Sequence, residues 1–164
     1  MAKPNDTADS NVKAHKTHHA FPAGRSRPLA YDALADWTIL HRGEKPIARL
    51  FHVAYLAKTR SRKPRPITFV FNGGPGAASA YLHVGALGPR RVVFNRDGSL
   101  PPPPAQLSDN RESWLPFTDL VFIDPIGTGF SRTVHEESTG DDKGKADDKN
   151  ENTEFWEVER DLES

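Results

Sequence analysis

The chain has 164 residues, of which 36% are hydrophobic, 14 are prolines and 12 are glycines, so it holds enough apolar side chains for one modest domain together with loops or a tail. Lysine plus arginine and aspartate plus glutamate both number 22, so the overall charge gives no electrostatic reason to expect nucleic acid or an acidic membrane surface as a partner. The absence of cysteine excludes disulfides and thiol catalysis, and no apolar run approaches the roughly 20 residues of a membrane-spanning helix.

Residues 1–28 are polar and show no hydrophobic periodicity, which predicts a disordered tail before a folded part at residues 29–164. The tail contains His15, His18 and His19, but no framework of further ligands accompanies them, which favours a solvated histidine-rich segment over a metal site. The first 30 residues also lack the apolar centre of a secretory signal. Either the protein stays inside the cell or its true start is missing, and the compartment stays open.

The next residues carry the patterns of strands. Branched and aromatic side chains around Gly43 predict an antiparallel hairpin of residues 31–41 and 46–57, followed by a basic, solvated connection at residues 58–66. The apolar run at residues 67–71 predicts a strand that is buried on both faces. A short helix is expected over residues 77–87, where Gly88 and Pro89 stop it, and a further strand at residues 91–95.

A second buried strand is predicted at residues 120–124, and like the first it runs straight into a glycine-containing turn. Two such turns are typical of an α/β sheet with its function at the strand ends. Residues 136–152 are acidic and of low complexity, and their spacing does not fit a calcium loop, so we expect a flexible, solvated loop. Residues 155–164 predict an amphipathic helix that stops at the chain end, as a cut through a larger domain would look.

The first glycine turn (residues 72–76, Asn-Gly-Gly-Pro-Gly) admits three interpretations. A Walker phosphate loop fails because Gly76 is not followed by Lys and Ser or Thr, and a dinucleotide loop loses one backbone N–H group at Pro75. An oxyanion hole fits better, because α/β-hydrolases place a backbone donor in the loop after the third strand. A plain structural turn is the third interpretation.

Four motifs in order resemble the serine carboxypeptidases of the S10 peptidase family. They are Asn72-Gly73-Gly74-Pro75-Gly76, Leu87-Gly88-Pro89, Asn110 through Ser113-Trp114, and Phe122-Ile123-Asp124-Pro125-Ile126-Gly127-Thr128-Gly129-Phe130-Ser131. The resemblance covers roughly residues 29–135. It implies an α/β-hydrolase fold, of which this chain holds the N-terminal part of the central sheet only, a Ser-Asp-His triad, and removal of C-terminal residues from peptides.

By position, the resemblance implies that Gly74 donates to the oxyanion, that Gly73 shapes the oxyanion turn and that Asn72 binds the terminal carboxylate of the substrate. The chain departs from the family at three neighbours. Val70 stands where the family usually has tryptophan, Ala86 where it has glutamate, and Ala77 where it has cysteine. The missing glutamate puts strict specificity for a free carboxyl terminus in doubt.

No nucleophile is expected in this chain. Ser131 lies in the second glycine turn (residues 124–131), but the Gly-x-Ser-x-Gly elbow is absent, so Ser131 and Asp124 are interpreted as structural and the isolated chain as inactive. The resemblance implies a peptide substrate with a free C-terminus and no cofactor or metal; we expect no nucleic acid or membrane partner, and the oligomeric state stays open. Two alternatives remain, a non-catalytic binding or assembly fragment and a nucleotide binder that uses residues 72–76.

Overall fold

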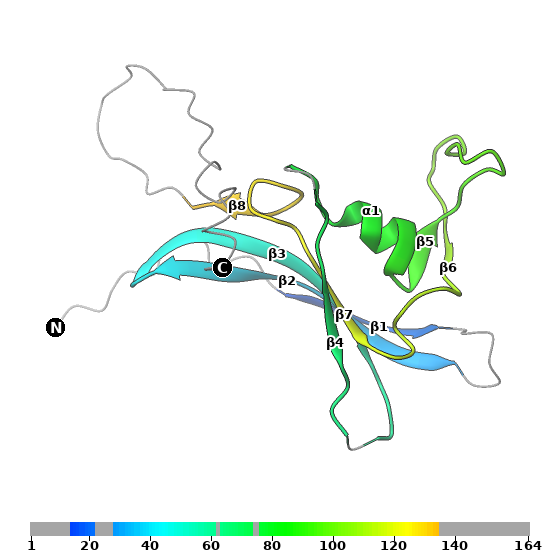
Figure 1. Ribbon diagram of the computed structural model, residues 1–164, viewed down its shortest axis with the longest axis horizontal. Helices are drawn as coiled ribbons and strands as arrows, with labels where there is room; N and C mark the ends of the chain where they lie inside the picture. Colours follow the sequence, from blue (N-terminus) through cyan, green and yellow to red (C-terminus); the bar gives the residue numbers. More distant parts are fainter. Residues whose placement is uncertain (1–13, 22–27, 62, 74–75, 135–164) are drawn as a thin grey trace.

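The computed structural model describes residues 14–21, 28–61, 63–73 and 76–134. These residues form a mixed six-stranded sheet (Figure 1). Five of its strands lie in the order β1-β2-β3-β7-β4, and the sixth, β8, pairs with β3. Its strands are β1 (His15–Phe21), β2 (Leu29–Arg42), β3 (Lys45–Ala57), β4 (Ile67–Val70), β7 (Asp119–Ile123) and β8 (Arg132–Thr133). A separate pair is formed by β5 (Arg90–Val92) and β6 (Leu107–Asp109), and the described helical segment is α1 (Ala80–Leu82) continued by η1 (His83–Leu87). This mixture agrees with the predicted α/β class.

The predicted hairpin is confirmed, because β2 and β3 pair antiparallel along almost their whole length. Gly43 makes the turn with a φ of 63°, a left-handed conformation that glycine adopts without strain. The same register places Tyr31 and Ala33 of β2 opposite Ala57 and Tyr55 of β3. These residues contribute to the hydrophobic core, so the hairpin forms one side of the core.

Residues 15–21 differ from the expected disordered tail, since they form β1 and pair antiparallel with β2. The physical reason is the open edge of β2, which supplies hydrogen-bond partners to a segment with no apolar pattern of its own. Ion pairs reinforce this pairing, because Lys16 on β1 and Lys58 after β3 lie 2.8 Å and 2.7 Å from the carboxylate of Asp32. His18 also bonds to Asp32, at 2.6 Å. The hydrogen bonds from Lys16, Lys58 and His18 hold the pKa of Asp32 well below its usual range.

Strands β4 and β7 are confirmed close to their predicted positions, and they pair in parallel. The burial of β4 differs from the prediction. Val70 is buried, but Ile67 and Phe69 are 55% and 62% exposed. The reason is that β4 is the end strand of the described sheet, and its second face is not covered by other described residues.

The core lies on one face of the sheet. Its buried members are Tyr31, Val70, Leu115, Leu120 and Phe122, and side chains of the helical segment, Leu82 and Leu87, pack against them. The helical segment begins three residues later than predicted and changes from α1 to the wider π-helical turn η1. Its expected stop is confirmed, because Gly88 donates its N–H to the carbonyl of His83 at 2.9 Å. A Cβ at Gly88 would collide with that same carbonyl oxygen.

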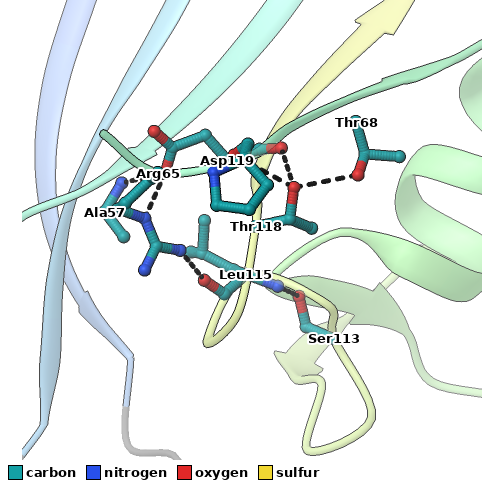
Figure 2. Close-up of polar contacts among 8 residues, drawn as sticks. Ala57, Arg65, Thr68, Ser113, Leu115, Thr118 and Asp119 are labelled. Carbon is teal, nitrogen blue, oxygen red and sulfur yellow. Dashed lines mark hydrogen bonds and ion pairs between the residues drawn. The ribbon is translucent and has the colours of Figure 1, made fainter. Parts of the chain in front are cut away.

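The basic connection before β4 is not wholly solvated. Figure 2 shows the guanidinium of Arg65 between Asp119 and Leu115, with Nε 2.9 Å from the Asp119 carboxylate and Nη2 2.7 Å from the Leu115 carbonyl. Asp119 also accepts the N–H of Ala57 at 3.0 Å. Thr118 bonds in turn to Thr68 at 2.9 Å. These contacts join the start of β4 to the start of β7 and to the end of β3.

Candidate active site

The two glycine turns leave the same edge of the sheet. The first glycine turn follows β4 and the second follows β7, and these two strands are adjacent and parallel. The carboxyl ends of parallel neighbours meet at one edge, which is where α/β sheets place their binding sites. Contacts of the second glycine turn with residues 78 and 79, described below, bring it close to the segment that follows the first turn. The sequence predicted a glycine turn after each of two strands, and the structure adds that these strands are neighbours.

Asn72 and Gly73 are the described residues at the start of the first glycine turn. Asn72 is half-buried and Gly73 is exposed. Among the described residues, no hydrogen bond is found for the side-chain amide of Asn72, and nothing lies within 4 Å of where a Cβ on Gly73 would stand. Gly74 and Pro75 lie outside the described residues. The carboxylate-binding role of Asn72 and the oxyanion roles of Gly73 and Gly74 therefore stay predictions.

Asp124 joins the second glycine turn to the segment that follows the first. Its Oδ1 accepts both the backbone N–H and the hydroxyl of Ser79, each at 2.9 Å, and its Oδ2 accepts the N–H of Phe130 at 3.2 Å. Asp124 and Ser79 are 5% and 4% exposed, so the contact is almost fully out of water. The prediction that Asp124 stabilises its own turn is confirmed. The link to Ser79 was not predicted, since no local pattern indicates a partner 45 residues away.

Gly129 makes room for this contact. Its φ is 48°, and a Cβ built on it would overlap the carboxylate of Asp124 and lie 3.1 Å from the Cβ of Ala78. The second glycine turn therefore lies directly against residue 78, which follows the first turn. A glycine at this position is required by both the backbone conformation and the close packing.

Ser131 is the hydroxyl that comes nearest to a nucleophile motif, and the structure gives it a structural role. It is fully buried, donates its hydroxyl to the carbonyl of Asp124 at 2.6 Å and accepts the N–H of Phe51 at 2.7 Å. Both hydrogen-bonding functions of the hydroxyl are therefore used in tying the second glycine turn to β3. The interpretation of Ser131 as a structural residue is confirmed.

The second and third of the four motifs, Leu87-Gly88-Pro89 and the segment from Asn110 to Trp114, are hydrogen-bonded to each other. The side-chain amide of Asn110, which is 1% exposed, donates to the carbonyls of Ala86 at 2.5 Å and Gly88 at 2.8 Å. Ser113 donates its hydroxyl to the carbonyl of Leu87 at 2.8 Å. These bonds satisfy the carbonyls left free at the end of η1. The sequence showed both motifs but gave no sign that one caps the other.

A half-buried polar pair joins β3 to the helical segment. The hydroxyl of Tyr55 is 2.6 Å from Nε2 of His83, and the His83 ring stacks on Phe122 with centroids 4.5 Å apart. Burial lowers the pKa of His83 to about 4, an effect that the negative charge of Asp124 opposes, and burial raises the pKa of Tyr55 above its usual value. Both side chains are therefore neutral around pH 7.

In the part of the chain that the structure describes, no group of three or more histidine, aspartate or glutamate side chains is arranged to hold a metal ion. Within the same ranges, no helix is both long and apolar enough to cross a membrane. The predicted acidic loop at residues 136–152 and the helix predicted at residues 155–164 lie outside the described residues.

Comparison with known proteins places this sequence in a family. A family model described as serine carboxypeptidase matches residues 39–158, a range that includes both glycine turns. Serine carboxypeptidase-like 33 of Arabidopsis thaliana is 37% identical over 86 residues, which are 51% of this chain and 16% of that protein. Pheromone-processing carboxypeptidase KEX1 of Puccinia graminis f. sp. tritici is 37% identical over 79 residues, 47% of this chain and 11% of that protein.

A longer match is found with serine carboxypeptidase-like 40 of Arabidopsis thaliana, which is 30% identical over 125 residues, 75% of this chain and 22% of that protein. The chain thus spans less than a quarter of the length of each of these three relatives. The family model, by contrast, covers well over half of the chain, and the four motifs of the sequence lie within its match. The chain belongs to the serine carboxypeptidase family.

Proposed function

We propose that this chain supplies the carboxylate-binding and oxyanion-binding side of a serine-type carboxypeptidase with an α/β-hydrolase fold, which removes C-terminal residues from peptides through an acyl-enzyme. The observation that carries the proposal is the position of the first glycine turn. It follows β4 at the edge where the parallel strands β4 and β7 end, and the family match covers it. Such an edge is where the donors of a hydrolase site are expected.

In this proposal the backbone N–H of Gly74 donates to the oxyanion of the tetrahedral intermediate, and Gly73 shapes the turn. A fixed donor of this kind lowers the activation barrier by about 3 kcal/mol, because it needs no reorganisation when the charge develops. The open space around Gly73 supports the assignment. No described atom there requires a glycine, so the missing side chain leaves room for a ligand to approach the backbone.

Asn72 is proposed to hold the C-terminal carboxylate of the peptide. A side-chain amide donates hydrogen bonds to a carboxylate without carrying a fixed charge. Asn72 is half-buried at the start of the first glycine turn, two residues after the end of β4. Ala86 occupies the place where the family usually has glutamate, and we therefore expect this chain to discriminate less strictly between a free carboxyl terminus and a blocked one.

No residue of this chain is assigned as the nucleophile. Ser131 is the nearest candidate, and its buried hydroxyl already bonds to Asp124 and Phe51. A serine that attacks a carbonyl carbon must instead be exposed to substrate and bonded to a general base. The proposed contribution of the first glycine turn is therefore recognition of negative charge on the substrate. Formation of the acyl-enzyme is proposed for the whole enzyme.

The test is a titration of the 164-residue polypeptide with a short peptide, followed by the ¹⁵N NMR signals of the asparagine side-chain amides. We expect shifts at Asn72 with the free carboxylate and weaker shifts with the C-terminal amide of the same peptide. Asn72→Ala should abolish the carboxylate-dependent binding. Asn95→Ala is the matched control, because Asn95 is an exposed asparagine whose described bonds are local, to Gly98 and Ser99. Identical binding by the two peptides, or micromolar binding of NAD or ATP, would contradict the proposal.

A further inference from the structure

We infer that Asp124 is a positioning residue for the proposed site: its carboxylate fixes the chain on the C-terminal side of the first glycine turn and so sets the direction in which Asn72 and Gly73 face the substrate. This inference rests on the proposed function, since it assigns Asp124 to the same site. The residue touches no reacting atom in this scheme. It acts through Ser79.

The geometry at Asp124 is that of a clamp between two segments. Oδ1 receives two hydrogen bonds from Ser79, one from the backbone and one from the hydroxyl, each 2.9 Å long. Oδ2 receives one from the backbone of Phe130 at 3.2 Å. All three partners are donors, which is the pattern that a deprotonated carboxylate requires. Two bonds to one residue fix both the position and the orientation of Ser79.

A carboxylate that only stabilised its own turn would need the contact with Phe130 alone. The two bonds to Ser79 span 45 residues and are buried, so each is strong and each would be costly to lose. None of the ion pairs among the described residues involves Asp124. Its hydrogen-bonding capacity is directed at the segment that follows the first glycine turn.

The first glycine turn has few other anchors. Among the described residues, no hydrogen bond is found for Asn72, Gly73 or Gly76. Upstream the chain is held by β4, which ends at Val70, and downstream the first side-chain anchor is Ser79. Gly129 adds packing at the same point, since a Cβ there would contact Ala78. The described residues on the two sides of the turn are therefore held by β4 at one end and by Asp124 at the other.

Substitution of Asp124 by asparagine keeps the size of the side chain and breaks one arm of the clamp. Whichever way the new amide is oriented, its NH₂ group faces an N–H donor, either that of Ser79 or that of Phe130. Ser79→Ala is the milder change, because it removes one of the three bonds and leaves the backbone contact. The matched control is Thr118→Val. Thr118 is equally buried and loses bonds to Pro66 and Thr68, at the opposite end of β4 and β7.

The experiment uses the full 164-residue chain and two readouts. The first is the ¹⁵N chemical shift of Gly73 and Gly76 together with hydrogen exchange at the Ser79 amide, which is buried and bonded to Asp124. The second is affinity for a short peptide with a free carboxyl terminus. In Asp124→Asn we expect the signals of both glycines to shift, exchange at the Ser79 amide to accelerate at least tenfold and peptide affinity to fall about tenfold. Ser79→Ala should change both in the same direction by a smaller factor. Thr118→Val should lower the melting temperature and leave both readouts unchanged.

Unchanged exchange and unchanged affinity in a folded Asp124→Asn protein would overturn the inference, as would equal changes in Thr118→Val. If Asp124→Asn does not fold, Ser79→Ala decides by the same criteria. The two proposals fail in different ways. Absence of carboxylate-dependent binding in the unsubstituted chain refutes the proposed function, whereas the chemical shifts of Gly73 and Gly76 still decide whether Asp124 positions the residues of the turn.

Discussion

The hydroxyl of Tyr55 and Nε2 of His83 lie 2.6 Å apart where β3 passes beneath η1. The His83 ring also stacks on the ring of Phe122, so the imidazole is half-buried between Phe122 and Tyr55. Burial lowers the pKa of His83 from 6.5 to about 4. The folded chain therefore requires His83 to be neutral, and this requirement makes stability depend on pH.

Acidification from pH 6.5 to pH 4 is expected to destabilise the chain. In this range the unfolded chain binds a proton at His83 and the folded chain does not, so the free energy of unfolding falls as pH falls. The pKa difference corresponds to about 3 kcal/mol in total. Urea unfolding at several pH values measures the slope. His83→Phe, which keeps a ring against Phe122, should flatten it, whereas substitution of the exposed His41 by glutamine should not. An unchanged slope in His83→Phe would show that another group is responsible.

Removal of the Asp119 carboxylate is expected to be strongly destabilising. Asp119 pairs with Arg65 at 2.9 Å, and the side chains are only 14% and 17% exposed. Asp119→Ala leaves the guanidinium and the Ala57 N–H without their partner, and we expect a loss of about 3 kcal/mol in the free energy of unfolding. Asp109→Ala is the control. It breaks a 3.6 Å pair with Arg90 in which both side chains are well exposed, and should cost under about 1 kcal/mol. Equal losses in denaturant titrations of the two variants would refute this ranking.

Gly129 and Gly43 separate backbone strain from steric overlap. Both have a positive φ, 48° and 63°, but only at Gly129 would a Cβ meet other atoms, those of Asp124 and Ala78. We expect Gly43→Ala to cost about 1 kcal/mol from the backbone conformation alone. Gly129→Ala should cost at least about 3 kcal/mol, because strain and overlap add. Thermal unfolding of the two variants tests the difference, which a similar fall in melting temperature would contradict.

Ser131 should stabilise the fold and remain unreactive. Ser131→Ala leaves the Phe51 N–H and the Asp124 carbonyl without partners in a fully buried place, so a loss of about 2 kcal/mol is expected. A fluorophosphonate probe should not label the 164-residue polypeptide, since the hydroxyl is neither exposed nor bonded to a base. Mass spectrometry after incubation measures the labelling. A covalent adduct at Ser131 would mean that this residue serves as a nucleophile after all.

Several parts of the fold could be predicted because their signals are local. Alternating branched and aromatic side chains around Gly43 identified the β2–β3 hairpin, and Gly88 with Pro89 marked the end of the helical segment. Strand β1 was missed because its residues are polar. Its pairing depends on the open edge of β2 and on the charge of Asp32, and neither is visible in residues 15–21 themselves.

The candidate site divides in the same way. The sequence by itself determined the family, the order of the four motifs and the presence of a glycine turn after each of two strands, because these are properties of short, contiguous segments. Only the tertiary structure decided that Asp124 bonds to Ser79, that the Ser131 hydroxyl accepts the N–H of Phe51 and that one face of β4 is exposed. Each of these depends on how strands pair across 45 to 80 residues of chain, and no local pattern encodes that pairing.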